Sequence, residues 1–201
     1  MELIKKLPRL FWVNILWLIC CLPLVTAGAS TCAAFAVTLR FADDDEEVQS
    51  FGGITRRFFK AFRQDLLQGF FIQIFTILTV GLGCFFIYLA HDSGFGLIKV
   101  AAIVGYFILV MVFNIYSYPL IARYSNSFVN TLRNSVALFL QYANMSVKTM
   151  GLVVAEIAIL ALTYKIYFAG LLILPAVIFY TVSRTAKDIF VKLENPAPAE
   201  E

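Results

Sequence analysis

Few residues in this chain combine a reactive side chain with a setting in which it could do chemistry. Glu156 is the only carboxylate in the middle of an expected apolar helix, where a charge costs about 2.5 kcal/mol or more unless it faces protein or water. It could couple proton movement or contact a substrate, or it could be a hydrogen-bonded packing residue. The amides Asn14, Gln73 and Asn114 also lie in apolar stretches, where they could line a pathway or hydrogen-bond between helices. These four residues form the candidate intramembrane polar site.

The residue types that enzymes and metal sites need are scarce. His91 is the only histidine, and it stands beside Asp92 at an expected loop end. The four cysteines lack the spacing of metal ligands and are expected to be small buried hydrophobes: Cys20, Cys21, Cys32 and Cys84. There is no G-x-x-x-x-G-K-[ST] phosphate loop and no G-x-S-x-G nucleophile motif. We therefore expect no enzyme activity, no cofactor and no metal.

Long uncharged runs separate short segments that hold most of the Lys and Arg. Residues 11–39, 66–90, 100–122 and 166–183 contain no Asp, Glu, Lys, Arg or His. Runs of about 18 or more apolar residues are long enough to cross a bilayer. With 61% hydrophobic residues and a mean hydropathy of +0.83, the sequence predicts a polytopic all-α membrane protein. A net charge of +3 then reflects orientation in the membrane, and we expect no nucleic-acid partner.

We expect about five transmembrane helices in one membrane domain, residues 1–193, followed by a disordered tail at 194–201. Pro23 and Gly28 break the first apolar run, which predicts a span at 5–22 and a short helix at 29–41. Small residues at the start of that second helix would let it pack closely against a neighbour. Pro119 ends a later span. The remaining spans are expected at residues 66–90, 97–121, 147–164 and 166–183.

Two segments have the pattern of amphipathic helices on the cytoplasmic side of the membrane. From residue 54 to 66, apolar residues recur every four positions opposite a basic face: Arg56, Arg57, Lys60 and Arg63. This face is a candidate docking surface for a protein partner or for lipid head groups. The second segment, 128–143, has an apolar stripe that comprises Phe128, Leu132, Val136, Phe139 and Leu140. The acidic run at 43–47 is expected to be a solvated loop.

The order span, proline, amphipathic helix, span occurs twice, which indicates a weak two-unit repeat followed by a final helix. This arrangement places the C-terminus and most basic residues in the cytoplasm. A single crossing by the first segment would leave Lys5, Lys6 and Arg9 outside. The alternative is a re-entrant first segment, folded at Pro23 and Gly28, which would bring these three residues inside. We expect the single crossing, because two full crossings need roughly 40 residues.

Two blocks of the sequence resemble the YesL family of bacterial integral membrane proteins. They are NILWLICCLPLVTAGAS at residues 14–30 and FFKAFRQD at residues 58–65. Asp65 departs from the pattern, because the family more often has Asn at this position. The family's function is unknown, but the resemblance implies a genomic neighbourhood of carbohydrate importers and glycoside hydrolases. It transfers no catalytic or binding residue to this chain.

These observations lead to two hypotheses for a multi-pass protein of the bacterial cytoplasmic membrane. The first is an accessory or regulatory component of a carbohydrate ABC importer, with the permease or the ATPase of that importer as its partner. The second is a small autonomous solute transporter or channel. The first predicts that the two amphipathic helices dock a partner, and the second predicts a role for Glu156 in flux.

Overall fold

The computed structural model describes residues 2–89, 96–163 and 173–195, and the regular structure in these ranges is helical, as predicted. The expected turn at Lys165, the loop with His91 and residues 196–201 of the expected tail lie outside the described residues. The helices are α1 (Glu2–Cys21), α2 (Ala27–Ala42), α3 (Phe51–Gln64), α4 (Leu66–Leu89), α5 (Gly96–Asn114), α6 (Ser117–Arg123), α7 (Phe128–Gln141), α8 (Ala143–Thr163) and α9 (Leu174–Glu194). Short 3-10 turns occupy Leu24–Thr26 and Glu46–Gln49.

The first apolar run folds back on itself as a helical hairpin of α1 and α2. Pro23 stands between α1 and the first 3-10 turn, and Thr26 closes the bend through hydrogen bonds to the carbonyls of Cys20 and Pro23. At the other end of the hairpin, Lys6 Nζ lies 2.6 Å from a carboxylate oxygen of Asp44. The beginning of α1 and the end of α2 are therefore neighbours. This hairpin has the geometry of the alternative that folds at Pro23 and Gly28, and how it lies in a membrane stays a prediction.

Helix α2 is the centre of the molecule and contacts α1, α3, α4, α6 and α9. Its small residues explain how so many helices can reach it, as the sequence predicted. The backbones of α2 and α4 touch at Gly28 and Gly69, where a Cβ added to Gly28 would lie 2.0 Å from the carbonyl oxygen of Gly69. Only glycine permits this approach, so the crossing of α2 and α4 depends on both residues.

Helix α3 is amphipathic and buries its apolar face against α1 and α2. The side chain of Ser50 caps its N-terminus by accepting a hydrogen bond from the backbone N–H of Gly53. Ile54 and Phe58 are fully buried and Ala61 is nearly so. This packing fixes the rotation of α3 and turns most of its basic residues away from the core.

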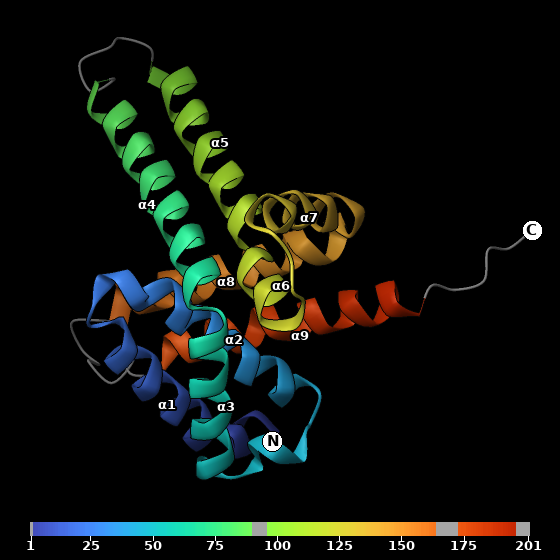
Figure 1. The fold of residues 1–201 in the computed structure, drawn as a ribbon. Coiled ribbons are helices and arrows are strands. Elements are labelled where there is room, and N and C mark those ends of the chain that lie inside the picture. The colour runs from blue at the N-terminus through green and yellow to red at the C-terminus, as the bar shows by residue number, and fades with distance from the viewer. Residues whose placement is uncertain (1, 90–95, 164–172, 196–201) are drawn as a thin grey trace, which may run out of the picture.

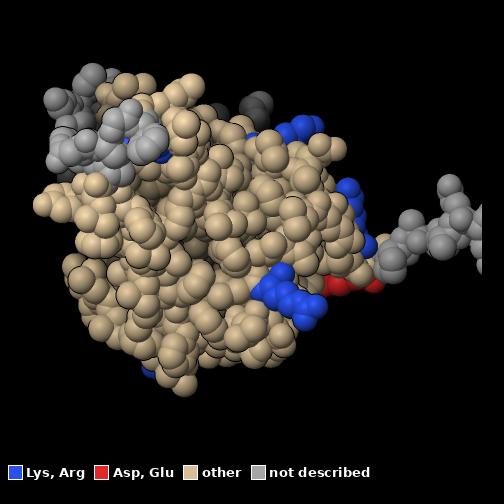
Figure 2. Space-filling model, turned by 90° about the horizontal axis from the view of Figure 1, so that it is seen from above, with Lys and Arg blue, Asp and Glu red and all other residues tan. Residues whose placement is uncertain are grey.

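Helices α4 and α5 project together from the rest of the molecule (Figure 1). Three segments in the described part are long and apolar enough to cross a membrane: Leu24–Ala42, Leu66–Leu89 and Gly96–Arg123. In the first segment, 67% of the most apolar stretch is buried inside the protein. In the other two segments, only 11% and 6% of that stretch is buried. Seen from above, most of the visible surface belongs to uncharged residues (Figure 2). The apolar hairpin formed by α4 and α5 is therefore available to lipid or to another protein.

The C-terminal half departs from the expected boundaries in two places. The expected span at 97–121 is divided, because α5 ends at Asn114 and α6 begins at Ser117, with Pro119 in the first turn of α6. Helix α9 begins at Leu174 and continues to Glu194, well beyond the predicted end at 183 and into the first residue of the expected tail. Its polar second half is stabilised by packing on α2.

Helix α7 turns most of the predicted apolar stripe toward the protein, because Phe128, Leu132, Val136 and Phe139 are half-buried and three of them pack against core residues. Its buried residues are Thr131, Ser135 and Leu138, whereas Leu140, which was assigned to the apolar stripe, is 68% exposed. Ser135 donates a hydrogen bond to the carbonyl oxygen of Val112 in α5. Two small polar side chains thus allow α7 to pack closely on its neighbours.

The elements of the predicted repeat recur in a matching form. Helices α3 and α7 both contain 14 residues, and a serine side chain caps each of them. In both cases one residue, Asp65 or Tyr142, separates the amphipathic helix from a long apolar helix. This similarity is limited to α3, α7 and the junctions that follow them. The repeat predicted from the two prolines stays a prediction.

Candidate functional site

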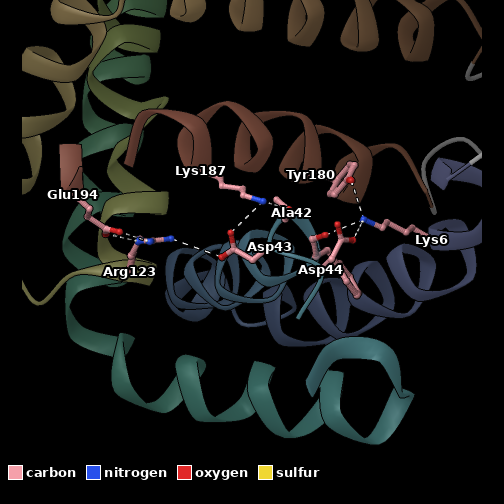
Figure 3. A network of polar contacts seen from close by, with 9 residues as sticks. Lys6, Ala42, Asp43, Asp44, Arg123, Tyr180, Lys187 and Glu194 are labelled. Atoms are coloured by element: carbon pink, nitrogen blue, oxygen red, sulfur yellow. Dashed lines mark hydrogen bonds and ion pairs between the residues drawn. The ribbon is translucent and has the colours of Figure 1, made fainter. Parts of the chain in front are cut away.

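The most extensive polar contacts gather at the C-terminal end of α2 (Figure 3). We call these residues the α2 terminal network, and it brings together side chains from α1, α6 and α9 and from the loop after α2: Lys6, Asp43, Asp44, Arg123, Lys187 and Glu194. Lys6 donates to the carbonyl of Phe41 at 3.0 Å, and Lys187 donates to the carbonyl of Ala42 at 2.6 Å. Since the last carbonyls of a helix lack partners within it, two ammonium groups there complement the negative end of the helix dipole.

Acidic residues after α2 and at the end of α9 complete the network. Lys187 lies 3.5 Å from Asp43, and Arg123 lies 3.8 Å from Asp43 and 2.9 Å from Glu194. The hydrogen bond and the charge of Lys6 lower the pKa of the Asp44 carboxyl group. The hydroxyl of Tyr124 and the guanidinium of Arg123 lower the pKa of Glu194. The acidic run is thus more than a solvated loop, because it ties α1, α6 and α9 to α2.

A cavity of about 280 Å³ opens beside this network. Its charged lining consists of Arg40, Asp43, Asp45, Arg57 and Arg123. Arg40 pairs with Asp45 and, at 3.2 Å, with Glu47, a residue near the cavity. Burial lowers the pKa of Arg57, whose Nε has no hydrogen-bond partner in the described part of the chain. Positive and negative side chains are mixed in this cavity, so it has no clear preference for an anion or a cation.

Asp65 stands at the junction of α3 and α4 and is only 8% exposed. Its backbone connects the two helices, because its N–H bonds to the Ala61 carbonyl and its own carbonyl accepts from Gly69. Burial raises the pKa of its carboxyl group to about 6, while the positive charge of Arg57 opposes this shift. An asparagine would fill the same space without a charge.

The four basic residues predicted on one face of α3 are divided by the structure. Arg57 turns inward to the cavity, whereas Arg56, Lys60 and Arg63 line an open groove with Phe59 and Gln64. The spacing of Arg56, Lys60 and Arg63 places them on one side of a helix. Only these three belong to the candidate docking surface.

Glu156 is half-buried on α8 and points toward α9. One of its carboxylate oxygens accepts a hydrogen bond from Thr181 at 2.8 Å. The other, Oε2, is buried and has no hydrogen-bond partner within the described residues. The structure therefore places Glu156 between two helices, which fits a packing residue and leaves one oxygen unsatisfied.

The structure brings two of the three candidate amides together. Gln73 accepts a hydrogen bond from Tyr118 at 3.2 Å, and Asn114 accepts one from Thr76 at 2.5 Å. Both contacts join α4 to the chain around the α5–α6 break, where they hold helices together. Asn14 lies on α1, and its side chain is fully buried. The four candidates do not form one site.

Within the described residues, no group of three or more His, Cys, Asp or Glu is arranged to hold a metal ion. All four cysteines are free; Cys32 is buried, whereas Cys84 is exposed on α4, contrary to expectation.

Sequence reasoning did not find the α2 terminal network. Its members come from positions as far apart as residues 6 and 194, and each ordinarily indicates a solvated end of a membrane helix. The one available signal was the run of five acids at 43–47, in a chain in which basic residues otherwise outnumber acidic ones.

Comparison with known proteins relates part of the chain to a protein family. Residues 10–88 match the model of a family described as "Protein of unknown function, DUF624". The matched segment runs from α1 through most of α4 and includes Gly28, Asp65 and Gly69. No curated protein and no solved structure matches the chain.

Proposed function

We propose that this chain is an accessory or regulatory component of a carbohydrate ABC importer in the bacterial cytoplasmic membrane. The observation that carries the proposal is the outer surface of α7. Val129 and Leu140 on this helix are 69% and 68% exposed, while the polar Thr131 and Ser135 are buried. Val129 and Leu140 therefore leave apolar surface of α7 uncovered among exposed polar residues of the same helix, and such a mixed surface is suited to a protein partner.

The positions of the polar side chains near the apolar helices also support an accessory role. A carbohydrate pathway needs hydroxyl and amide groups that face a water-filled space. In the described part of the chain, Gln73, Asn114 and Tyr118 instead bond across helices. The proposal that the partner is a carbohydrate importer rests on the resemblance to the YesL family, and its permease or ATPase is the expected contact.

The cytoplasmic assignment of the charged end rests on the distribution of basic residues. Lys6, Arg123 and Lys187 meet in the α2 terminal network, and Arg133 stands nearby in sequence on α7. Lys and Arg in short loops favour the cytoplasmic side. An ATPase or a permease loop in the cytoplasm could therefore reach α7.

Co-purification from native membranes in mild detergent tests this proposal, with mass spectrometry to identify stoichiometric partners. We expect the wild-type chain to recover an importer subunit and Leu140→Glu to lose it, because a charge replaces an apolar contact at the interface. Val191→Glu is the matched control, since Val191 is 43% exposed on α9, and it should retain the partner. Recovery of the wild-type chain without any importer subunit would contradict the proposal.

The alternative is an autonomous transporter or channel, and it is favoured by the buried Oε2 of Glu156, which has no hydrogen-bond partner among the described residues. Under this alternative, Glu156→Gln would impair solute flux into liposomes that contain the purified protein. Under the accessory proposal, the wild-type protein and Glu156→Gln give the same background flux.

A further inference from the structure

The basic residues of this protein differ in whether the chain itself neutralises them. Lys6, Arg40 and Arg123 each form an ion pair with an acidic side chain. On α3, by contrast, Arg56, Lys60 and Arg63 have no ion pair or hydrogen bond from their side chains to any described residue. Three neighbouring positive charges without counter-charges repel one another, so an anion bound among them would be stabilised.

These three side chains share one groove. It has a volume of about 720 Å³, and Phe59 and Gln64 complete its lining, so that no carboxylate contributes to it. The opposite face of α3 is locked against the core by Ile54 and Phe58, which are fully buried. The cationic groove is therefore held in place by the fold and does not depend on how a free helix would rotate.

The position of the groove indicates where its anion comes from. Gln64 ends α3, and the candidate membrane span Leu66–Leu89 begins two residues later. Leu67 and Phe71, in the first turns of that span, are 68% and 53% exposed, and Phe59 within the groove is 40% exposed. Cations and an aromatic ring directly beside an exposed apolar span match the border between head groups and acyl chains.

We infer that this groove binds the head group of an anionic phospholipid. The guanidinium groups of Arg56 and Arg63 can each donate two hydrogen bonds to phosphate oxygens, and Lys60 adds a third positive charge. Phe59 and the first apolar residues of α4 contact the glycerol and acyl portion. The inference is independent of the proposed partner surface on α7.

Native mass spectrometry of the full-length protein in detergent tests the inference, with phosphatidylglycerol as the probe and phosphatidylcholine as the uncharged comparison. The test variant carries Arg56→Gln, Lys60→Gln and Arg63→Gln. The control variant carries Arg133→Gln, Lys148→Gln and Arg184→Gln, which removes the same charge from exposed positions on α7, α8 and α9. Unchanged melting temperatures would establish that both variants keep the fold.

We expect the wild-type protein to prefer phosphatidylglycerol and the control variant to retain that preference. The test variant should bind phosphatidylglycerol about a hundredfold more weakly, because it lacks three cations and each cation near an anionic surface contributes about fivefold. Equal losses in the two variants would overturn the inference, since they would reflect net charge alone. Retained lipid preference in the test variant together with loss of a co-purifying protein would also overturn it and would assign the groove to that partner.

Discussion

At the scale of single residues, the contact of Gly28 with Gly69 is the most demanding feature of the fold. The Cβ positions of these two glycines are occupied by the backbone of the other helix, at 2.0 Å and 2.5 Å. Neither position can accept a side chain unless α2 and α4 move apart. Because α2 contacts five other helices, such a movement would disturb the whole core.

We predict that Gly28→Val lowers the free energy of unfolding by about 2–3 kcal/mol, the usual cost of overpacking a tight contact. Gly81→Val is the control, because nothing lies within 4 Å of a Cβ at Gly81, and its effect should stay within about 0.5 kcal/mol. Denaturation of the purified proteins in detergent measures both. Equal stability of the two variants would show that α2 and α4 do not touch at Gly28.

At the scale of elements, the junction between α3 and α4 carries a buried charge. The folded pKa of Asp65 is about 6, above its ordinary value of 3.8, because burial disfavours the carboxylate. The folded state therefore holds the proton more tightly than the unfolded state. The resulting stabilisation is present below about pH 4 and is lost as the pH rises through 6.

We predict that Asp65→Asn removes this pH dependence. At pH 8 the variant should be more stable than the wild type by about 2–3 kcal/mol, and the two should converge near pH 4. Melting temperatures between pH 4 and 8 provide the measurement. Asp188→Asn, at an exposed position of α9, should follow the wild-type curve. Parallel curves for the wild type and Asp65→Asn would contradict this view of the junction.

The elements that could be predicted from the sequence are those with a strong local signal. The apolar pattern predicted the bounds of α4 to within a few residues, and it predicted α5 except for the break between α5 and α6. The alternation of basic and apolar residues predicted α3. The hairpin of α1 and α2 was only the less favoured of two arrangements, because it depends on the contact of Lys6 with Asp44, 38 residues away. The burial of Thr131 and Ser135 on α7 was also missed, since hydrophobicity cannot anticipate that Ser135 bonds to Val112 in another helix.

The candidate site could be predicted only in part for the same reason. The sequence identified Arg56, Lys60 and Arg63 on one helical face, but it grouped Arg57 with them. Arg57 is about 100° around the helix from Arg56, and the position of α2 decides that its side chain enters the cavity beside Arg40. Charge pairs formed between distant segments leave no periodic trace in a sequence.

At the scale of the whole molecule, the α2 terminal network gathers the charged ends of several helices in one place. Lys6 from α1, Arg123 from α6 and Lys187 from α9 meet the acids after α2. The apolar bend between α1 and α2 lies at the opposite end of that hairpin, where Leu24 is 80% exposed. The start of α1 and the end of α2 therefore lie at the same end of the hairpin, and we propose that this end faces the cytoplasm because of its basic residues.

Cysteine accessibility in oriented membrane vesicles tests this arrangement most directly. In a background without Cys20, Cys21, Cys32 and Cys84, single cysteines would replace Pro8 near the start of α1, Glu46 after α2 and Leu24 at the bend. We predict that a membrane-impermeant maleimide labels Pro8→Cys and Glu46→Cys from the cytoplasmic side only, and that it does not label Leu24→Cys from that side. Labelling of Pro8→Cys from the outer side and Glu46→Cys from the cytoplasmic side would contradict the hairpin and restore a single crossing.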